Sequence, residues 1–559
     1  MAKRYRPVLR DQPFLLPPDM REWLPEGHAV WLVIGAVPYL DTSVFHARRR
    51  TGGAGAAGYD PDMLVTLLIW AYAHGVTSSR KIEAACWQDV AFRVICAGDV
   101  PDHVTVARFR AAFPGAAQAL FTEVLVLCAK LGMGKLGTVA LDGMKIAANA
   151  SKDANRTEAT LRKLAAAEAS RAAAAHAEAD AAEDALFGAG NRGGDVPAEV
   201  ACPATRAGRI AAALADLEAE RLAAQAEQDA QAREYLARGA GAPGAPPKSA
   251  AVQAAGERLD RARAARVAQL AELQRRGRAG NGDVEGYCKV KAARQALEKA
   301  GARQAAAEAR AAAAPGPVRN ITDPDSRLMP TRNGFLQGYN AQNVPSEDGL
   351  IIATELTQDT TDTEWFEPML ARAEDAAALI TAHQPPPPAP GTPASQDSDG
   401  TPDSDTSQDH PDSDTSQNSD GTGIGLFLSD AGYLSRRNLT IAGPDRLIAV
   451  GKHRDLEKTA RQATTTRGPG DPGERDGDPI AAMAARLATP DGITAYRKRG
   501  HIAETPHGQI KHNMGIRRLA TRGKPRASAE WAFITTVHNL LKAITTGHLT
   551  PATLTALAS

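Results

Sequence analysis

The spacing of apolar residues predicts helices over the first 130 residues. In "DPDMLVTLLIWAYAHGVTSSRKIEAACWQDVAFRVIC" apolar positions recur at helical spacing, with a break at Gly75 and a restart at Thr77-Ser78-Ser79. The stretch "PDHVTVARFRAAF" repeats the pattern and places Arg108 and Arg110 on one helix. Short capped helices that bear basic residues suit a helix-turn-helix-like module, and they also suit an ordinary helical bundle with solvated arginines.

The pattern then changes to that of strands. The segment "GTVALDGMKIAAN" predicts two short strands joined by a hairpin turn at "DG", which puts Asp142 at the end of a strand. The runs Gly338–Val344 and Leu350–Leu356 predict a second hairpin. "IGLFLSD" and "RLIAVGK" are short apolar runs typical of buried strands, separated by a helix that begins near Ser435. We expect a mixed α/β domain of about five strands with flanking helices.

Two segments interrupt this domain. Residues 151–318 are rich in Ala, Arg and Glu with a thin apolar stripe, which predicts about four helices in hairpins or a coiled coil. Residues 385–422 are rich in Pro and then in Asp, Ser and Thr, and contain "PDSDTSQ" twice. Such a composition cannot bury enough apolar surface to fold, so this segment is expected to be a disordered linker.

The predicted organisation has six parts. They are an N-terminal helical domain (1–130), the first part of the α/β core (131–150), the helical insertion (151–318), the second part of the core (319–384), the linker (385–422) and the third part of the core with a basic helical segment (423–546).

Composition adds expectations about the compartment. Lys and Arg together number 65, as do Asp and Glu, so the net charge is zero and only its distribution is informative. Five scattered cysteines form no CxxC pair, which favours a reduced, cytoplasmic protein without a disulfide framework. No apolar run reaches the roughly 18 residues that span a bilayer, so we expect no membrane association.

Three acidic residues are candidates for chemistry. Asp142 and Asp430 each end a predicted strand, where a lone aspartate is often only a turn former or a helix cap. Paired at one edge of a mixed sheet, they would suit Mg²⁺ or Mn²⁺. Glu504 is the single acid among nine Lys/Arg between Tyr496 and Arg526, and a basic run of this kind is typical of phosphate-backbone binding. Lys511 follows Glu504 by seven residues and would share its face of a regular helix that starts close to Pro506.

Three acids beside a basic surface predict metal-assisted phosphodiester chemistry, in which two ions activate a nucleophile and stabilise the leaving oxygen. His501, His507 and His512 are instead expected to face solvent or phosphate, because no cysteine accompanies them.

An ordered set of blocks resembles the DDE transposases of bacterial insertion sequences, in the group with a Tyr-Arg-Glu-Lys signature around the third acid. The blocks are the two N-terminal helical stretches quoted above, "VALDGMKIAANAS", "NITDPDSRLMPTRNGFLQGYNAQ", "SDAGYLS", and "YRKRGHIAETPHGQIKHNMGIRRLATRG" followed by "AEWAFITTVHNLLK". They run in order from about Tyr5 to Lys542, with the insertion and the linker left out. Arg499 is followed by four residues before Glu504, where the commonest form of the signature has three.

The resemblance implies an RNase H-like core. It also implies that Asp142, Asp430 and Glu504 are the catalytic metal ligands, for two Mg²⁺ or Mn²⁺ ions. Tyr496, Arg499 and Lys511 are then the accompanying signature residues. The expected DNA-binding residues are Arg497, Lys498, Arg517, Arg518, Arg522 and Lys524.

The function expected from this resemblance is transposition. The protein would bind the terminal inverted repeats of an element in double-stranded DNA, cleave there and join the ends to target DNA, as a homodimer or larger assembly in the bacterial cytoplasm. Two alternatives remain: a metal-dependent nuclease with the same core, and an inactive DNA-binding remnant.

Overall fold

The structure is a computed structural model. It describes residues 19–47, 58–111, 113–187, 206–238, 247–278, 282–313, 316–386, 423–451 and 478–558. The predicted linker lies outside these residues from position 387 onward. The chain divides into two compact units, one formed by Met1–Lys152 with Asp325–Ser559 and the other by Asp153–Pro324. The second unit falls where the sequence analysis expects the insertion.

Short helices make up the N-terminal part of the first unit. They are η1 (Met20–Trp23), α1 (Ala29–Ala36), η2 (Val37–Tyr39), α2 (Ser43–His46), α3 (Pro61–Ala73), α4 (Ser79–Gln88), α5 (Val90–Ile95), α6 (His103–Ala111), η3 (Phe113–Gly115) and α7 (Ala117–Lys130). Helix α3 is buried continuously from Leu64 to Tyr72, because α1, η2, α5 and α17 (Lys524–Thr545) pack around it. Asp60 caps it by accepting a hydrogen bond from the Asp62 amide.

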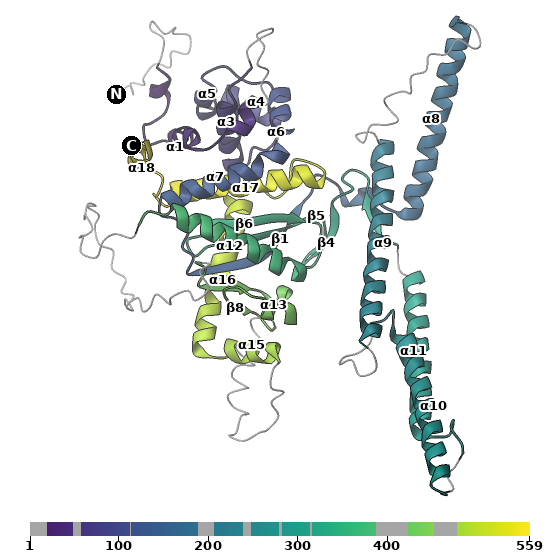
Figure 1. Ribbon diagram of the computed structural model, residues 1–559. Helices are drawn as coiled ribbons and strands as arrows, with labels where there is room; N and C mark the ends of the chain where they lie inside the picture. The colour runs from purple at the N-terminus through teal and green to yellow at the C-terminus, as the bar shows by residue number, and fades with distance from the viewer. Residues whose placement is uncertain are drawn as a thin grey trace, which may run out of the picture. The chain divides into compact units, whose positions relative to one another are not determined.

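A mixed six-stranded sheet follows, shown in Figure 1. Its strands are β1 (Thr138–Ala147), β4 (Arg327–Thr331), β5 (Gly334–Pro345), β6 (Ile351–Thr357), β7 (Leu426–Ser429) and β8 (Asp445–Ile448). Strands β4 and β6 pair with the two ends of β5, which pairs antiparallel with β1. Strands β7 and β8 continue the sheet from β1 in parallel orientation. The predicted β5–β6 hairpin is confirmed.

The hairpin predicted at "DG" is wrong, because β1 is one uninterrupted strand of ten residues. Gly143 does not form a turn; its lack of a side chain allows close packing. A Cβ atom at this position would lie 2.6 Å from Oδ1 of Asp362 and 2.9 Å from Nε2 of Gln342. The glycine therefore lets polar side chains approach the strand next to Asp142.

Helices flank the sheet. They are η5 (Thr363–Trp365), α12 (Phe366–His383), η6 (Ala431–Tyr433), α13 (Arg436–Thr440), α15 (Pro479–Leu487), α16 (Pro490–Gly508), the π-helical turn η7 (Gln509–Asn513), α17 and α18 (Pro551–Ala558). The sheet and the N-terminal helices share one hydrophobic core. Asn539 of α17 joins this core to the edge of β6, since its amide accepts from the Ile351 nitrogen (2.9 Å) and donates to the Ile351 carbonyl (2.8 Å). A helix begins near Ser435, as predicted: α13 starts at Arg436, and the Ser435 side chain caps it.

The second unit contains four long helices and one short ladder. The elements are η4 (Lys152–Ala154), β2 (Asn155–Thr157), α8 (Glu158–Phe187), α9 (Arg206–Ala237), α10 (Ala251–Arg275), α11 (Cys288–Ala313) and β3 (Val318–Asn320). Helices α8 and α9 pack together around Leu161 and Ile210, and α10 packs on α11 around Leu259 and Val290. None of the described helices in either unit has the length and apolar content needed to cross a membrane.

Candidate active site

Two parallel strands bring Asp142 and Asp430 to the same part of the sheet. Leu141 of β1 is the register partner of Ser429 of β7, and each aspartate is the next residue along its strand. Beyond this point β1 continues while β7 ends, so Asp430 occupies the carboxyl end of a strand, where ligands bind in open α/β sheets. Its carboxylate also accepts from the Gly432 amide at 2.8 Å.

Helix α16 places Arg499 between the two aspartates. Nη2 of Arg499 lies 3.1 Å from Oδ1 of Asp142 and 3.8 Å from Oδ2 of Asp430. One turn earlier on the same helix, the buried Tyr496 donates its hydroxyl to the Ser429 carbonyl at 3.2 Å. The tyrosine thus ties α16 to the end of β7, and the arginine bridges the two acids.

Burial and charge act in opposite directions on Asp142. The pKa of Asp142 is raised to about 6, mainly by burial and also by the charges of Asp430 and Asp362, while the Arg499 guanidinium and the Gly143 amide act to lower it. Burial lowers the pKa of Arg499, but Asp142, Tyr496 and Asp430 more than offset this, so the pKa lies above its ordinary value. Asp142 is therefore a desolvated carboxylate, and the positive charge of Arg499 does not fully offset the effect of its burial.

Asp362 is a fourth acid at this site, and the sequence analysis missed it. Its Oδ1 accepts from Asn340 Nδ2 at 2.6 Å and Gln342 Nε2 at 2.7 Å, and Lys145 Nζ lies at 3.5 Å. The residue lies in the irregular stretch between β6 and η5, where no periodicity distinguishes it. The one signal in the sequence was the presence of Asn340 and Gln342 on the buried strand β5, because buried amides need a polar partner.

The structure places Glu504 and Lys511 differently from the prediction. Helix α16 begins at Pro490, so Pro506 lies well inside it, and the α-helix ends at Gly508. Lys511 then stands on the π-helical turn η7, and the two residues do not belong to one regular helix. The pKa of Lys511 lies below its ordinary value because burial lowers it more than the charge of Asp142 raises it. Glu504 is solvent-exposed, and its charge helps to raise the pKa of Arg499.

Contrary to the prediction, His507 does not face solvent. Its side chain is buried, with Nδ1 3.8 Å from Oδ2 of Asp142 and Nε2 2.9 Å from Nδ2 of Asn343. Burial lowers the pKa of His507 to about 3, so the imidazole is neutral at physiological pH. His501 and His512 are exposed, as expected.

Residues 514–523, called the basic loop below, follow the π-helical turn and are anchored at the far end of β1. The Leu519 amide donates to the Ala147 carbonyl at 2.9 Å, and Asn149 Nδ2 donates to the Ala520 carbonyl at 2.7 Å. Among the six basic residues predicted to bind DNA, all but Lys524 are exposed, and Lys524 is half-buried. The two that precede Arg499, Arg497 and Lys498, lie on the outer face of α16.

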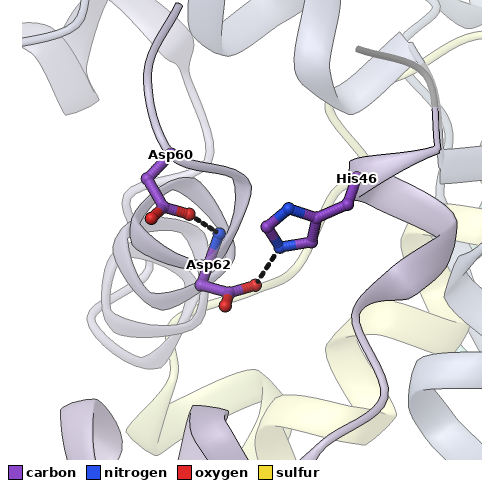
Figure 2. A group of neighbouring side chains, drawn as sticks. All are labelled: His46, Asp60 and Asp62. Carbon is purple, nitrogen blue, oxygen red and sulfur yellow. Dashed lines mark hydrogen bonds and ion pairs between the residues drawn. The ribbon is translucent and has the colours of Figure 1, made fainter. Parts of the chain in front are cut away.

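Within the described ranges, three metal-ligating side chains with atoms within 4.8 Å of one another occur at His46, Asp60 and Asp62 (Figure 2), not at the three predicted acids. This group has structural roles. Asp62 Oδ1 lies 2.9 Å from His46 Nε2 and accepts from Thr42 Oγ1 at 2.5 Å, while Asp60 caps α3. The hydrogen bonds hold α2 against the start of α3.

Two stretches of the chain match family models of transposases. Residues 18–112 match the model described as "Transposase domain (DUF772)", and residues 477–544 match the model described as "Transposase DDE domain". No curated protein and no solved structure matches the chain. The second match includes α16, the π-helical turn and most of α17, which carry Arg499, Glu504 and Lys511. The two matches support a DDE transposase of the insertion-sequence type.

Proposed function

We propose that the protein is an insertion-sequence transposase that binds the ends of its element and catalyses metal-dependent cleavage and strand transfer. One observation carries the proposal: adjacent parallel strands bring Asp142 and Asp430 together, and a single nitrogen of Arg499 contacts both carboxylates. The two transposase matches lie on either side of these strands in the sequence.

The topology of the sheet supports an RNase H-like core. Strands β1, β5 and β6 form an antiparallel meander once the insertion is left aside, and β7 and β8 then add in parallel on the other edge of β1. Helix α12 makes the connection from β6 to β7, and α13 the one from β7 to β8. Asp142 and Asp430 lie where the parallel and antiparallel halves of the sheet meet, at β1.

The residues at this point fit divalent cations. Carboxylate oxygens are the ligands that Mg²⁺ and Mn²⁺ prefer. The guanidinium nitrogen shared by Asp142 and Asp430 marks a position where both carboxylates accept one positive charge. Glu504, exposed on the same helix as Arg499, is the proposed third ligand. Two ions bound here would stabilise the attacking and leaving oxygens during in-line displacement at phosphorus.

The surrounding residues of the chain hold and neutralise the DNA. Tyr496 fixes the end of β7 through the Ser429 carbonyl and so orients Asp430. Arg499 and Lys511 supply positive charge to the phosphate at the site, and the basic loop extends that charge along β1. The N-terminal helices would recognise the terminal repeats. Because two ends must be joined, at least two active sites are needed, and we propose a homodimer acting on DNA in the bacterial cytoplasm.

An assay on a substrate with paired element ends tests this function. The wild-type chain with Mg²⁺ should cleave at the ends and yield joined products, and Asp430→Asn should lower the cleavage rate by at least about 10³-fold. Asp375→Asn, which changes an exposed aspartate on α12, is the matched control and should cleave like wild type.

Each alternative function has its own result. Hydrolysis without joined products would identify a nuclease, and end binding by a wild-type chain that does not cleave would identify an inactive remnant. Unchanged cleavage by Asp430→Asn would show that the acids are wrongly assigned.

A further inference from the structure

His507 is a buried histidine with both ring nitrogens directed at polar partners. It lies on the inner face of α16, between β1 and β5, and only 8% of its surface is exposed. Nδ1 faces Oδ2 of Asp142 at 3.8 Å, and Nε2 lies 2.9 Å from Nδ2 of Asn343. The other oxygen of Asp142 is already committed, since Oδ1 accepts from Gly143 N at 3.0 Å and from Arg499 at 3.1 Å. His507 is therefore placed to act on the second oxygen.

The orientation of the Asn343 amide is fixed by its other neighbours. Its Oδ1 accepts from Thr354 Oγ1 at 2.7 Å and from Trp531 Nε1 at 3.4 Å. The indole nitrogen can only donate, and it also donates to Thr354 Oγ1 at 2.8 Å, which leaves the threonine hydrogen for Asn343. An amide turned the other way would direct its NH₂ group at the indole N–H, which cannot accept, and would take the Asn343 acceptor away from the threonine hydrogen. The amide oxygen therefore faces Trp531 and Thr354, and the NH₂ group faces His507.

This arrangement selects one tautomer of the imidazole. Because Asn343 donates to Nε2, that nitrogen must carry a lone pair and cannot carry a hydrogen. The ring of His507 is then neutral by geometry, and its single hydrogen resides on Nδ1. The N–H bond that results is the one facing Asp142.

We propose that His507 is a positioning residue, which orients the Asp142 carboxylate for cation binding through Nδ1–H, with its tautomer set by Asn343. The inference rests on the proposed role of Asp142 as a metal ligand. The 3.8 Å separation exceeds a hydrogen bond. A cation held by Asp142 would compete with Arg499 for this carboxylate, and a small rotation of the carboxylate would then bring Oδ2 within hydrogen-bond reach of Nδ1–H. Outer residues that hold a ligating side chain in this way contribute about 10–100-fold to metal affinity or activity.

Binding of Mn²⁺ to the full-length chain without DNA, followed by electron paramagnetic resonance of the unbound ion, tests the inference. His507→Leu should weaken binding by about 10–100-fold. His507→Asn should restore most of it, because the asparagine Nδ2 is as many bonds from the backbone as Nδ1 of histidine. His538→Leu is the matched control, since His538 is also buried, on α17, and contacts Gln509 and Asn539 instead of an acid.

Asp142→Asn separates the metal site itself from the positioning role of His507. If this variant binds Mn²⁺ like wild type, or if wild type binds none, the proposed site is wrong and the inference is lost with it. If Asp142→Asn loses binding but His507→Leu retains it, the site stands and the positioning role is overturned. The positioning role is also overturned if His538→Leu weakens binding as much as His507→Leu, because the loss would then reflect destabilisation alone.

The tautomer can be measured directly. Long-range ¹H–¹⁵N spectra of protein labelled with ¹⁵N-histidine should show the His507 hydrogen on Nδ1, with the signal assigned by its absence from His507→Asn. A hydrogen on Nε2 would overturn the inference, since Asn343 could then not be the donor.

Discussion

Asp142 is the residue at which burial and the proposed function conflict most directly. Its carboxylate is buried beside two other acids, while Arg499 and the Gly143 amide favour its charged form. The arrangement costs stability in the absence of metal but leaves a carboxylate whose charge a divalent ion can neutralise. Such a cost is common where an active site needs unfavourable groups held together.

The pH dependence of stability should reveal this cost. The pKa of Asp142 is about 6 in the folded chain and near 3.8 when exposed, so its contribution to stability is fully present below pH 3.8 and is lost as the pH rises through 6. Asp142→Asn cannot ionise. In metal-free buffer the variant should therefore gain about 2 kcal/mol over wild type between pH 4 and pH 7.

Urea unfolding at a series of pH values measures this difference. Asp375→Asn, on the exposed side of α12, should show almost no pH-dependent difference from wild type. A difference between Asp142→Asn and wild type that is constant across the range would contradict the raised pKa.

At the scale of elements, Glu530 of α17 holds the basic loop in place. The side chain is 3% exposed, and its carboxylate accepts from the Ala520 and Thr521 amides, from Thr521 Oγ1 and from the Tyr72 hydroxyl. These hydrogen bonds connect the loop to both α17 and α3. A single buried acid thus fixes the backbone from which several arginines project.

Glu530→Gln should destabilise the protein by about 2–4 kcal/mol, because the new NH₂ group faces backbone N–H donors and the charge-assisted bonds are lost. Thermal or denaturant unfolding measures the change. Glu364→Gln, at an exposed position in η5, is the control and should lie within about 0.5 kcal/mol of wild type. Equal stabilities for the two variants would show that Glu530 does not hold the loop.

The basic loop should bind the DNA backbone. Arg518 is exposed, so its replacement by Gln should change binding without disturbing the fold. If it contacts one phosphate, the slope of log K against log salt should fall in magnitude by about 0.9, whatever the DNA sequence. Fluorescence anisotropy with labelled DNA at several salt concentrations gives the slope. Lys130→Gln, at the exposed end of α7, should leave it unchanged, and an unchanged slope for Arg518→Gln would remove the loop from the interface.

At the scale of the whole molecule, the first and last residues of the second unit lie next to each other. Strands β2 and β3 pair antiparallel with Asn155 opposite Asn320, and the Ile321 amide donates to the Ala154 carbonyl at 3.1 Å. Ladder partners lie about 5 Å apart, so the unit closes on itself where it begins. Arg319 of β3 also forms ion pairs with Asp216 and Glu220 of α9, which connect this ladder to the helices of the unit.

Replacing residues 153–324 with a short Gly/Ser linker should therefore leave the first unit folded. The core strands β1 and β4 lie on either side of the excised segment and keep their own partners. We expect a single cooperative transition by calorimetry within about 5 °C of the wild-type transition of that unit. Loss of cooperative unfolding would mean that the second unit is needed for the first to fold.

Local sequence determined much of the architecture. Helical spacing identified the N-terminal helices, period-two runs identified the β5–β6 hairpin, and an Ala-rich composition marked the insertion. The end of β7 could be recognised because an apolar run stops at Asp430, whereas β1 continues through Asp142 to Ala147. These features could be predicted because the pattern of buried and exposed positions within one element depends only on consecutive residues.

What the sequence could not give depends on neighbours that are distant in the chain. "DG" is a turn signal, but the pairing of β1 with both β5 and β7 overrides it. Strand β4 was missed because five residues containing Pro330 have little strand character of their own. Asp362 and His507 became part of the site only when β5 and α16 brought them to Asp142. Burial and charge at a site arise from long-range packing, so only the tertiary structure decided them.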